Sequence, residues 1–397
     1  MAGRHACRSA RLFALGAAAA LWLAGCGGGG SSSDVPPLSA PAALGEKIFN
    51  DTSLSASRRQ SCASCHVSEA GNAQDNALPA QLGGADLTLQ GSRVSPSIRY
   101  LAFGTAFHLD SGGTPSGGFF WDVRASSLAD QAAGPFFNRV EMALASKAEL
   151  AARLSEASYA EAFRQVFGND IFNRPDEALA AVTVSLQQFQ VEDVRLRPFS
   201  SRYDAFLRGT AQLGDQASRG LALFNDPAKG HCSSCHPSNK GVDGSLPLLT
   251  NFTYHSLGVP RNGELAINAD PSFFDLGLCA REGGDLAARS DLCGAFKVPL
   301  LRNVALRRAF FHNGRFKSLE EVVSFYAERD THPERFYPRK ADGSIDKFDD
   351  LPEAFKANVS RGEPPYNRRA GDAPALSAAE VADVVAFLKT LTDGWPP

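Results

Sequence analysis

Methionine is almost absent from this chain of 397 residues. Only Met1 and Met142 occur, and the C-terminal half has none, so no methionine sulfur is available there to bind a metal. No stretch of useful length alternates apolar and polar residues, which argues against a mainly β architecture. Basic residues do not outnumber acidic ones, since 40 Lys and Arg stand against 43 Asp and Glu. Nucleic acid is therefore not expected as a partner.

The N-terminus has the features of a secretion signal. Three arginines precede an apolar run over residues 12–23, and Leu-Ala-Gly-Cys follows at 23–26. The apolar run is too short to cross a membrane as a helix, and a basic start before a short apolar core is typical of a signal peptide. The last four residues resemble the lipobox of bacterial lipoproteins, so Cys26 is the predicted lipidation site. A plain secretory signal cleaved nearby is the alternative.

The predicted cleavage site implies where the mature protein is located and divides the N-terminus into two segments. Residues 1–25 form the signal peptide, and residues 26–41 form a tether whose Gly and Ser content predicts flexibility. The mature protein would be anchored by lipid on the periplasmic side of a bacterial membrane. Nothing after Cys26 resembles an inner-membrane retention signal, which favours the outer membrane. Cleavage removes three arginines and no acidic residue, so the mature net charge is near −6.

One five-residue motif occurs twice, as Cys-Ala-Ser-Cys-His at 62–66 and as Cys-Ser-Ser-Cys-His at 232–236. Cys-x-x-Cys-His is the attachment site of a c-type haem. Two cysteines about one helical turn apart can form thioethers to the haem vinyl groups, and the adjoining histidine binds the iron. We therefore predict two covalently bound haem c groups. The predicted thioether residues are Cys62, Cys65, Cys232 and Cys235, and the predicted proximal iron ligands are His66 and His236.

Two further cysteines, Cys279 and Cys293, are left without a role in lipid or haem attachment. In an oxidising periplasm they are expected to form a disulfide. A loop of this size would contribute about 3 kcal/mol to stability if it is unstrained. A metal site is the alternative for this pair.

The two halves of the chain repeat the same landmarks in the same order, which indicates a tandem duplication. Because helical patterns dominate, the predicted fold is mainly α, with two tandem cytochrome c-like domains at 42–200 and 201–397 that each wrap one haem. The first half has an insertion at 104–118 that predicts a mobile loop. The matching segments are 45–51 with 220–226, 95–102 with 298–305, 120–124 with 311–315, and the closing helices at 175–191 and after Ser377, where Glu380 completes a capping box.

The second axial position of each haem iron decides whether that haem is open or closed. Ser318 and Glu321 form a capping box, and Tyr326 then lies on the apolar face of the predicted helix. In the first half the equivalent position is Pro135, which cannot bind iron. The repeat therefore predicts one haem closed by the Tyr326 oxygen and one haem left open.

Other assignments remain possible at this stage. Tyr326 could be a buried core tyrosine with a satisfied hydroxyl. The rival ligands of the second iron are His255, His312 and His332, and His108 in the insertion is the local histidine that could close the first haem.

Several motifs resemble the bacterial dihaem cytochrome c peroxidase/MauG family over nearly the whole mature chain. They lie at 120–125, 130–132, 134–135, 140–142 and 301–305, and stretches at 325–331, 336–338 and 347–352 resemble the MauG- and MbnH-like members. The resemblance implies that Tyr326 is the tyrosine ligand of the second iron. It implies that Glu141 is the distal acid/base residue of the open first haem, and that Gln131 and Pro135 line the same pocket. Trp121 would lie between the haems, and His312 would support the second haem without binding its iron.

Two positions depart from the family pattern. The asparagine through which family members bind calcium is Val94 here, so one hard oxygen ligand is lost and calcium is doubtful, although backbone carbonyls could serve. A glycine near the tryptophan is Val123, and this bulkier residue could shift the tryptophan.

We therefore predict a peroxide-dependent dihaem oxidoreductase of MauG type. As the resemblance implies, hydrogen peroxide would generate a high-valent two-haem state, which oxidises a periplasmic protein partner, plausibly at a tryptophan. The first alternative is a cytochrome c peroxidase that reduces peroxide to water with electrons from a small redox protein. The second is a dihaem electron carrier without enzymatic activity.

Overall fold

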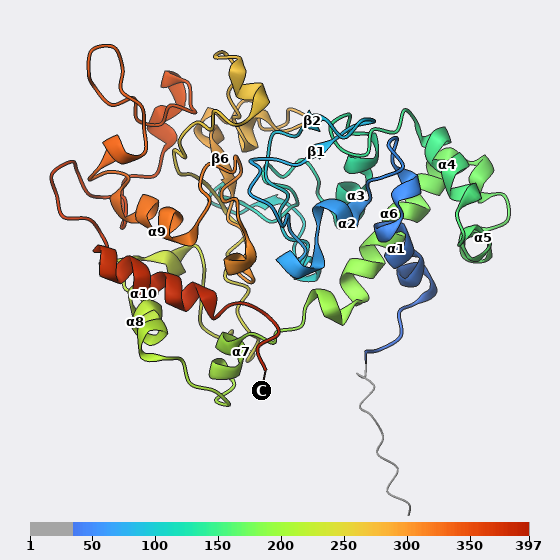
Figure 1. Ribbon diagram of the computed structural model, residues 1–397, viewed down its shortest axis with the longest axis horizontal. Coiled ribbons are helices and arrows are strands. Elements are labelled where there is room, and N and C mark those ends of the chain that lie inside the picture. The colour runs from blue at the N-terminus through green and yellow to red at the C-terminus, as the bar shows by residue number, and fades with distance from the viewer. Residues whose placement is uncertain (1–34, 397) are drawn as a thin grey trace, which may run out of the picture. The chain divides into compact units, whose positions relative to one another are not determined.

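The computed structural model describes residues 35–396 (Figure 1). The predicted signal peptide, Cys26 and most of the predicted tether lie outside the described residues. The first helix begins at Ala40, two residues before the predicted start of the first domain, because Ser39 caps it and accepts a hydrogen bond from the Ala42 amide at 3.3 Å. No helix within 35–396 is both long and apolar enough to span a bilayer.

The fold is mainly helical, as predicted. Its α-helices are α1 (Ala40–Asn50), α2 (Cys62–Cys65), α3 (Leu128–Phe137), α4 (Lys147–Glu156), α5 (Ala160–Phe167), α6 (Pro175–Glu192), α7 (Arg202–Leu207), α8 (Asp215–Asn225), α9 (Leu319–Glu328) and α10 (Ala378–Lys389). The strands of residues 35–396 form three short antiparallel ribbons, β1 (Leu82–Gly83) with β2 (Leu89–Gln90), β3 (His108–Leu109) with β4 (Pro115–Ser116), and β5 (Tyr254–Ser256) with β6 (Ala295–Lys297).

The duplication is visible in how the helices pack. In the first half α1 lies against α6, and in the second half α8 lies against α10 (Figure 1). Each pair crosses at a glycine. A Cβ atom on Gly45 would lie 2.0 Å from the carbonyl oxygen of Ser185, and one on Gly220 would lie 1.9 Å from that of Asp383. Both crossings therefore require glycine at the same place in the repeat.

Two large clusters of buried apolar side chains form the core. One is drawn from residues 44–196 and the other from residues 203–391. Each contains an aromatic pair next to its glycine crossing, Phe49 with Phe189 at 5.5 Å between ring centroids and Phe224 with Phe387 at 5.1 Å. Each half thus buries its own core around its own helix pair.

Capping residues set where the site-bearing helices begin. Ser127 caps α3 by accepting a hydrogen bond from the Asp130 amide at 3.1 Å. The capping box predicted for α9 is confirmed, since Ser318 and Glu321 bond each other's backbone amides. Ser377 and Glu380 do the same at α10. Because α3 and α9 start after equivalent serines, the residues along them correspond one to one.

Tyr100 of the first half packs against a buried ion pair of the second half. The Arg302 guanidinium donates to the Asp204 carboxylate at 2.8 and 2.9 Å, and both side chains are almost fully buried. Arg302 also lies 4.8 Å from the ring centroid of Tyr100, which belongs to the first half. Asp393 accepts hydrogen bonds from Tyr100 at 2.7 Å and from Asn303 at 2.6 Å. Removing one member of such a pair would leave a buried charge without compensation.

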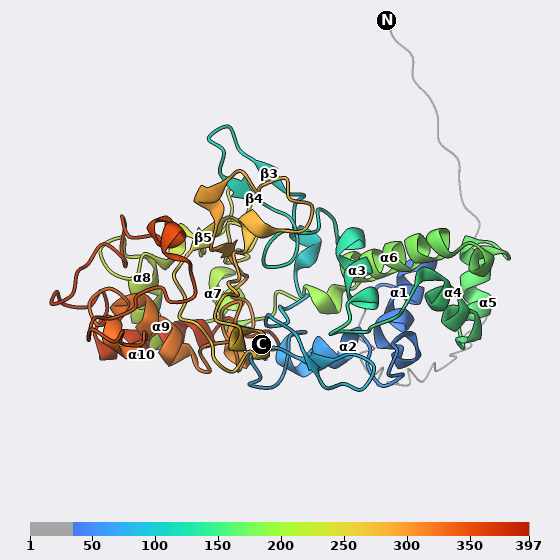
Figure 2. The same ribbon diagram turned by 90° about the horizontal axis from the view of Figure 1, so that it is seen from above.

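The segment 104–118, predicted as a mobile loop, contains the β3–β4 ribbon. It lies beside β5, where Ser116 bridges to Thr253 and the Tyr254 hydroxyl donates to the Gly117 carbonyl at 2.6 Å (Figure 2). Next to it, Cys279 and Cys293 form a disulfide. The insertion is therefore tied to a disulfide-bonded segment of the second half.

The helix crossings generate a stability prediction. Gly220→Ala should lower the free energy of unfolding of the haem-loaded protein by about 1–3 kcal/mol, because the added methyl group overlaps the Asp383 carbonyl. Thermal unfolding followed by circular dichroism measures this. Gly263→Ala is the matched control, since a Cβ there meets no atom within 4 Å. Equal melting temperatures for the two variants would contradict the packing account.

Candidate active site

Two cavities contain the predicted site residues. The first cavity, of about 490 Å³, is lined by Cys62, Cys65 and His66. The second cavity, of about 180 Å³, is lined by Cys232, Cys235 and His236. Each Cys-x-x-Cys-His motif therefore opens onto a cavity of its own.

A tight helical turn positions each motif. The His66 amide donates to the Cys62 carbonyl at 3.0 Å, and the His236 amide donates to the Cys232 carbonyl at 2.9 Å. The Nδ1 atom of each imidazole lies near a backbone carbonyl, 3.3 Å from Asn72 for His66 and 2.7 Å from Leu249 for His236. An imidazole held in this way presents Nε2 as the ligating atom.

The surroundings of both motifs fit a haem group. Burial lowers the pKa of His66 and lowers that of His236 to about 4, so both rings are neutral near pH 7, as iron ligation requires. The Oε1 atoms of Gln60 and Gln190 are buried without a hydrogen-bond partner, and both glutamines line the first cavity. Buried polar atoms normally have partners, so these two indicate that another group belongs there.

The first cavity brings together the residues predicted for peroxide chemistry. Trp121, Gln131, Pro135 and Glu141 all line it with His66. Gln131 and Pro135 come from α3, and the chain then turns back so that Glu141 also faces the cavity.

The Glu141 carboxylate is oriented by a hydrogen bond and partly shielded from solvent. It accepts a hydrogen bond from the Asn138 side chain at 2.7 Å. Burial raises the pKa of Glu141, and the nearby Arg124 and Asn138 oppose that shift. The β1–β2 ribbon covers the turn from outside, since the Gly84 amide donates to the Glu141 carbonyl at 2.8 Å. A carboxyl group with a raised pKa can exchange protons closer to neutral pH.

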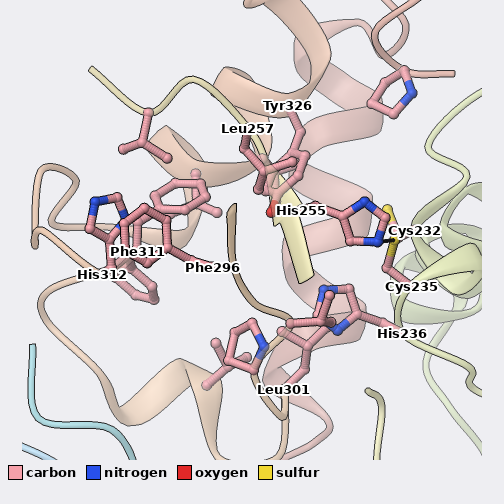
Figure 3. Close-up of a pocket in the computed structure, with 18 of the residues that line it drawn as sticks. Cys232, Cys235, His236, His255, Leu257, Phe296, Leu301, Phe311, His312 and Tyr326 are labelled. Atoms are coloured by element: carbon pink, nitrogen blue, oxygen red, sulfur yellow. Dashed lines mark hydrogen bonds between the residues drawn. The ribbon is translucent and has the colours of Figure 1, made fainter. Parts of the chain in front are cut away.

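The second cavity receives Tyr326 from α9, at the place where α3 has Pro135. Figure 3 shows the Tyr326 hydroxyl and the His236 imidazole reaching the cavity from different elements. Burial raises the pKa of the Tyr326 phenol, so the free side chain is neutral. Coordination to a cation would favour its deprotonated form.

The four histidines considered as rival ligands fall into two groups. His255 and His312 line the second cavity, whereas His108 and His332 line neither cavity. His255 Nε2 lies 3.5 Å from Cys235 Sγ, beside the attachment motif (Figure 3). His312 stacks on Phe296 with ring centroids 3.5 Å apart, and burial lowers its pKa to about 4.

Trp121 lines both cavities and is 8% exposed. Its indole Nε1 donates to the Val94 carbonyl at 2.9 Å. The Val94 amide in turn donates to the carbonyl of His312 at 2.8 Å, and His312 is the counterpart of Trp121 in the repeat. The backbone of one residue thus connects the equivalent positions of the two halves.

Val123 keeps the backbone conformation that its counterpart glycine has. Its φ is +56°, and that of Gly314 is +62°. This region is strained for a β-branched residue. The Val123 side chain is buried against Leu278 and Cys279 in a small apolar cluster beside the disulfide. The turn after Trp121 therefore has the same form in both halves despite the bulkier residue.

Many cavity residues were not identified from the sequence, among them three basic side chains and a tyrosine. Arg93 lines the first cavity, Tyr366 lines the second, and Lys297 and Arg307 line both. No motif marks them. Arg307 lies between the segments 298–305 and 311–315, which both match the first repeat, and this position was the available signal.

The doubt about calcium binding at position 94 stays a prediction. The Val94 carbonyl accepts the Trp121 hydrogen bond. Within residues 35–396 no three His, Cys, Asp or Glu side chains come together as a metal site.

Comparison with known proteins places the chain in a family. Residues 39–212 match the family model described as di-haem cytochrome c peroxidase. The chain is 34% identical to methylamine utilization protein MauG of Paracoccus denitrificans over 369 residues, which are 90% of each chain.

Two solved structures are also similar. The diheme peroxidase BthA of Burkholderia thailandensis has a TM-score of 0.83 and 38% identity, covering 90% of this chain and 87% of that one. A MauG-like protein associated with microbial copper homeostasis has a TM-score of 0.62 and 28% identity, covering 90% and 91%. The two Cys-x-x-Cys-His cavities and these similarities lead to one conclusion: the chain belongs to the di-haem cytochrome c peroxidase and MauG family of oxidoreductases.

Proposed function

We propose that this protein uses hydrogen peroxide at the first haem to oxidise a protein partner by electron transfer over a distance. The observation that carries the proposal is the difference between two equivalent positions, Pro135 on α3 and Tyr326 on α9. Proline cannot supply a ligating atom to the first cavity, whereas tyrosine at the equivalent place supplies an oxygen to the second cavity.

Bound haem supplies iron that reacts with peroxide and retains oxidising equivalents. His66 and His236 would hold the two irons through Nε2, and Cys62, Cys65, Cys232 and Cys235 would hold the porphyrins covalently. An anionic tyrosine oxygen from Tyr326 would favour the higher oxidation states of the second iron more than a thioether would.

Glu141 moves protons in the first cavity. Peroxide must lose one proton before it binds, and the departing oxygen must gain one. The Glu141 carboxylate can accept the first proton and return it, while Asn138 keeps its orientation. Gln131 lines the same cavity and can orient the peroxide through its amide.

Trp121 provides the connection between the cavities. Its indole faces both, and its Nε1–H is fixed by the Val94 carbonyl. Because the indole is 8% exposed, a large substrate cannot stack on it directly. Oxidation of a partner therefore has to proceed by electron transfer from the protein surface, and the resemblance to MauG-like proteins favours tryptophan as the oxidised residue.

The principal alternative is a cytochrome c peroxidase that receives electrons from a small redox protein and releases water. The matched family model carries that name. The lack of methionine in the second half argues against its usual ligand set. Pro135, at the position equivalent to Tyr326, argues against a carrier with two six-coordinate irons.

A stoichiometric peroxide experiment separates these functions. One equivalent of hydrogen peroxide added to the fully ferric protein should produce a two-equivalent oxidised state that persists for minutes and decays faster when a partner protein is added. Stopped-flow absorbance measures its formation and decay. If the ferric protein is inert and reacts only after one-electron reduction, the cytochrome c peroxidase alternative is correct.

The raised pKa of Glu141 predicts a pH dependence. The base form of a carboxyl group increases with pH, so the rate of the peroxide reaction should rise across a range above the ordinary glutamate pKa of 4.5. Glu141→Gln should abolish this rise of the rate with pH and lower the rate by about 10²–10⁴-fold. Glu161→Gln, an exposed glutamate of α5, is the control. An unchanged pH profile in Glu141→Gln would exclude Glu141 as the base.

A further inference from the structure

Two basic side chains lie where the two cavities meet. Lys297 and Arg307 line both the first and the second cavity. The Lys297 ammonium donates to the Gly118 carbonyl and lies near the rings of Phe119 and Phe252, at 5.6 and 5.3 Å from their centroids. Within the described chain no carboxylate pairs with either cation.

The two arginines that are fully buried within residues 35–396, Arg302 and Arg329, each pair with a carboxylate. The neighbouring Arg93 donates to Asp275 at 2.7 Å and pairs with Asp122 at 2.6 Å, and Arg302 pairs with Asp204. Burial alone lowers the pKa of Arg307 to about 10 and that of Lys297 to about 8. A half-buried cation of this kind needs an anion to offset its desolvation.

Haem carries two propionate carboxylates, and two haems belong to this family. We propose that Arg307, assisted by Lys297, is a built-in counter-cation for the haem carboxylates at the junction of the two cavities, in place of a bound divalent cation. Arg307 is the main contributor because a guanidinium can bind a carboxylate through two hydrogen bonds, whereas Lys297 already donates to Gly118.

The same junction disfavours a divalent cation for three reasons. Position 94 provides a valine side chain without an oxygen atom. The Val94 carbonyl already accepts the Trp121 indole hydrogen bond. Two positive side chains line the space, and they would repel a calcium ion.

A fixed positive charge at this point should act on both irons. A nearby cation destabilises the ferric state, which carries more positive charge than the ferrous state, and so raises the reduction potential. The inference requires the two haems but does not depend on which substrate is oxidised, so it can fail while the proposed function stands.

The experiment is a spectroelectrochemical titration of the haem-loaded protein. Arg307→Gln should lower the reduction potentials of both haems, and Arg307→Lys, which keeps the charge, should stay closer to the wild type. Arg308→Gln is the matched control, because it removes the same charge from the exposed neighbouring residue. Unchanged potentials in Arg307→Gln, or equal shifts in Arg307→Gln and Arg308→Gln, would overturn the proposal.

A second measurement uses the wild-type protein and does not depend on the folding of any variant. Calorimetric titration with calcium chloride should give no saturable heat. Treatment with a calcium chelator should leave the electron paramagnetic resonance spectrum unchanged. Saturable calcium binding that alters the haem spectra would show that a divalent cation occupies the junction, and the proposal would be wrong.

Discussion

The backbone of Val94 makes the contacts on which the arrangement of the two cavities depends. Its carbonyl fixes the Trp121 indole and its amide binds the backbone of His312, so it holds together the equivalent positions of the repeat. Neither bond uses the Val94 side chain, so the connection does not depend on which side chain stands at position 94. An electron-transfer path between two haem sites needs such rigidity, because the rate of transfer depends on the separation and orientation of its members.

The duplication explains how one protein obtains two different haem sites from one architecture. Each half crosses its helices at a glycine and begins its site helix after a serine cap. Single residues differ at equivalent positions of this shared architecture. The first half has Pro135 where the second has Tyr326, and Trp121 where the second has His312. Functional asymmetry therefore requires no change of fold, only of side chains at a few matched positions. The insertion at 104–118 and the disulfide-bonded segment add a second layer of packing around the Trp121 turn.

Local sequence signals predicted α6, α9 and α10 and the two attachment motifs. Caps at Ser318 and Ser377 are encoded within four residues, and the attachment motifs within five. The relations that the sequence did not reveal join distant residues. Arg93 pairs with Asp275, 182 positions away, and no periodicity indicates this pairing. No sequence signal distinguishes Arg307 from a surface arginine, because its position on the cavities follows from the fold. The strain at Val123 is visible only in its positive φ.

The central claim is that the two haem sites differ because Tyr326 closes one and Pro135 leaves the other open. Electron paramagnetic resonance of the ferric protein tests this most directly. The account predicts one high-spin and one low-spin haem in the wild type, with the low-spin signal altered in Tyr326→Phe. It should be unaltered in Tyr366→Phe, which removes the other phenol of the same cavity, with its ring centroid 6.0 Å from that of Tyr326. Two low-spin haems in the wild type, or an unaltered spectrum in Tyr326→Phe, would contradict it.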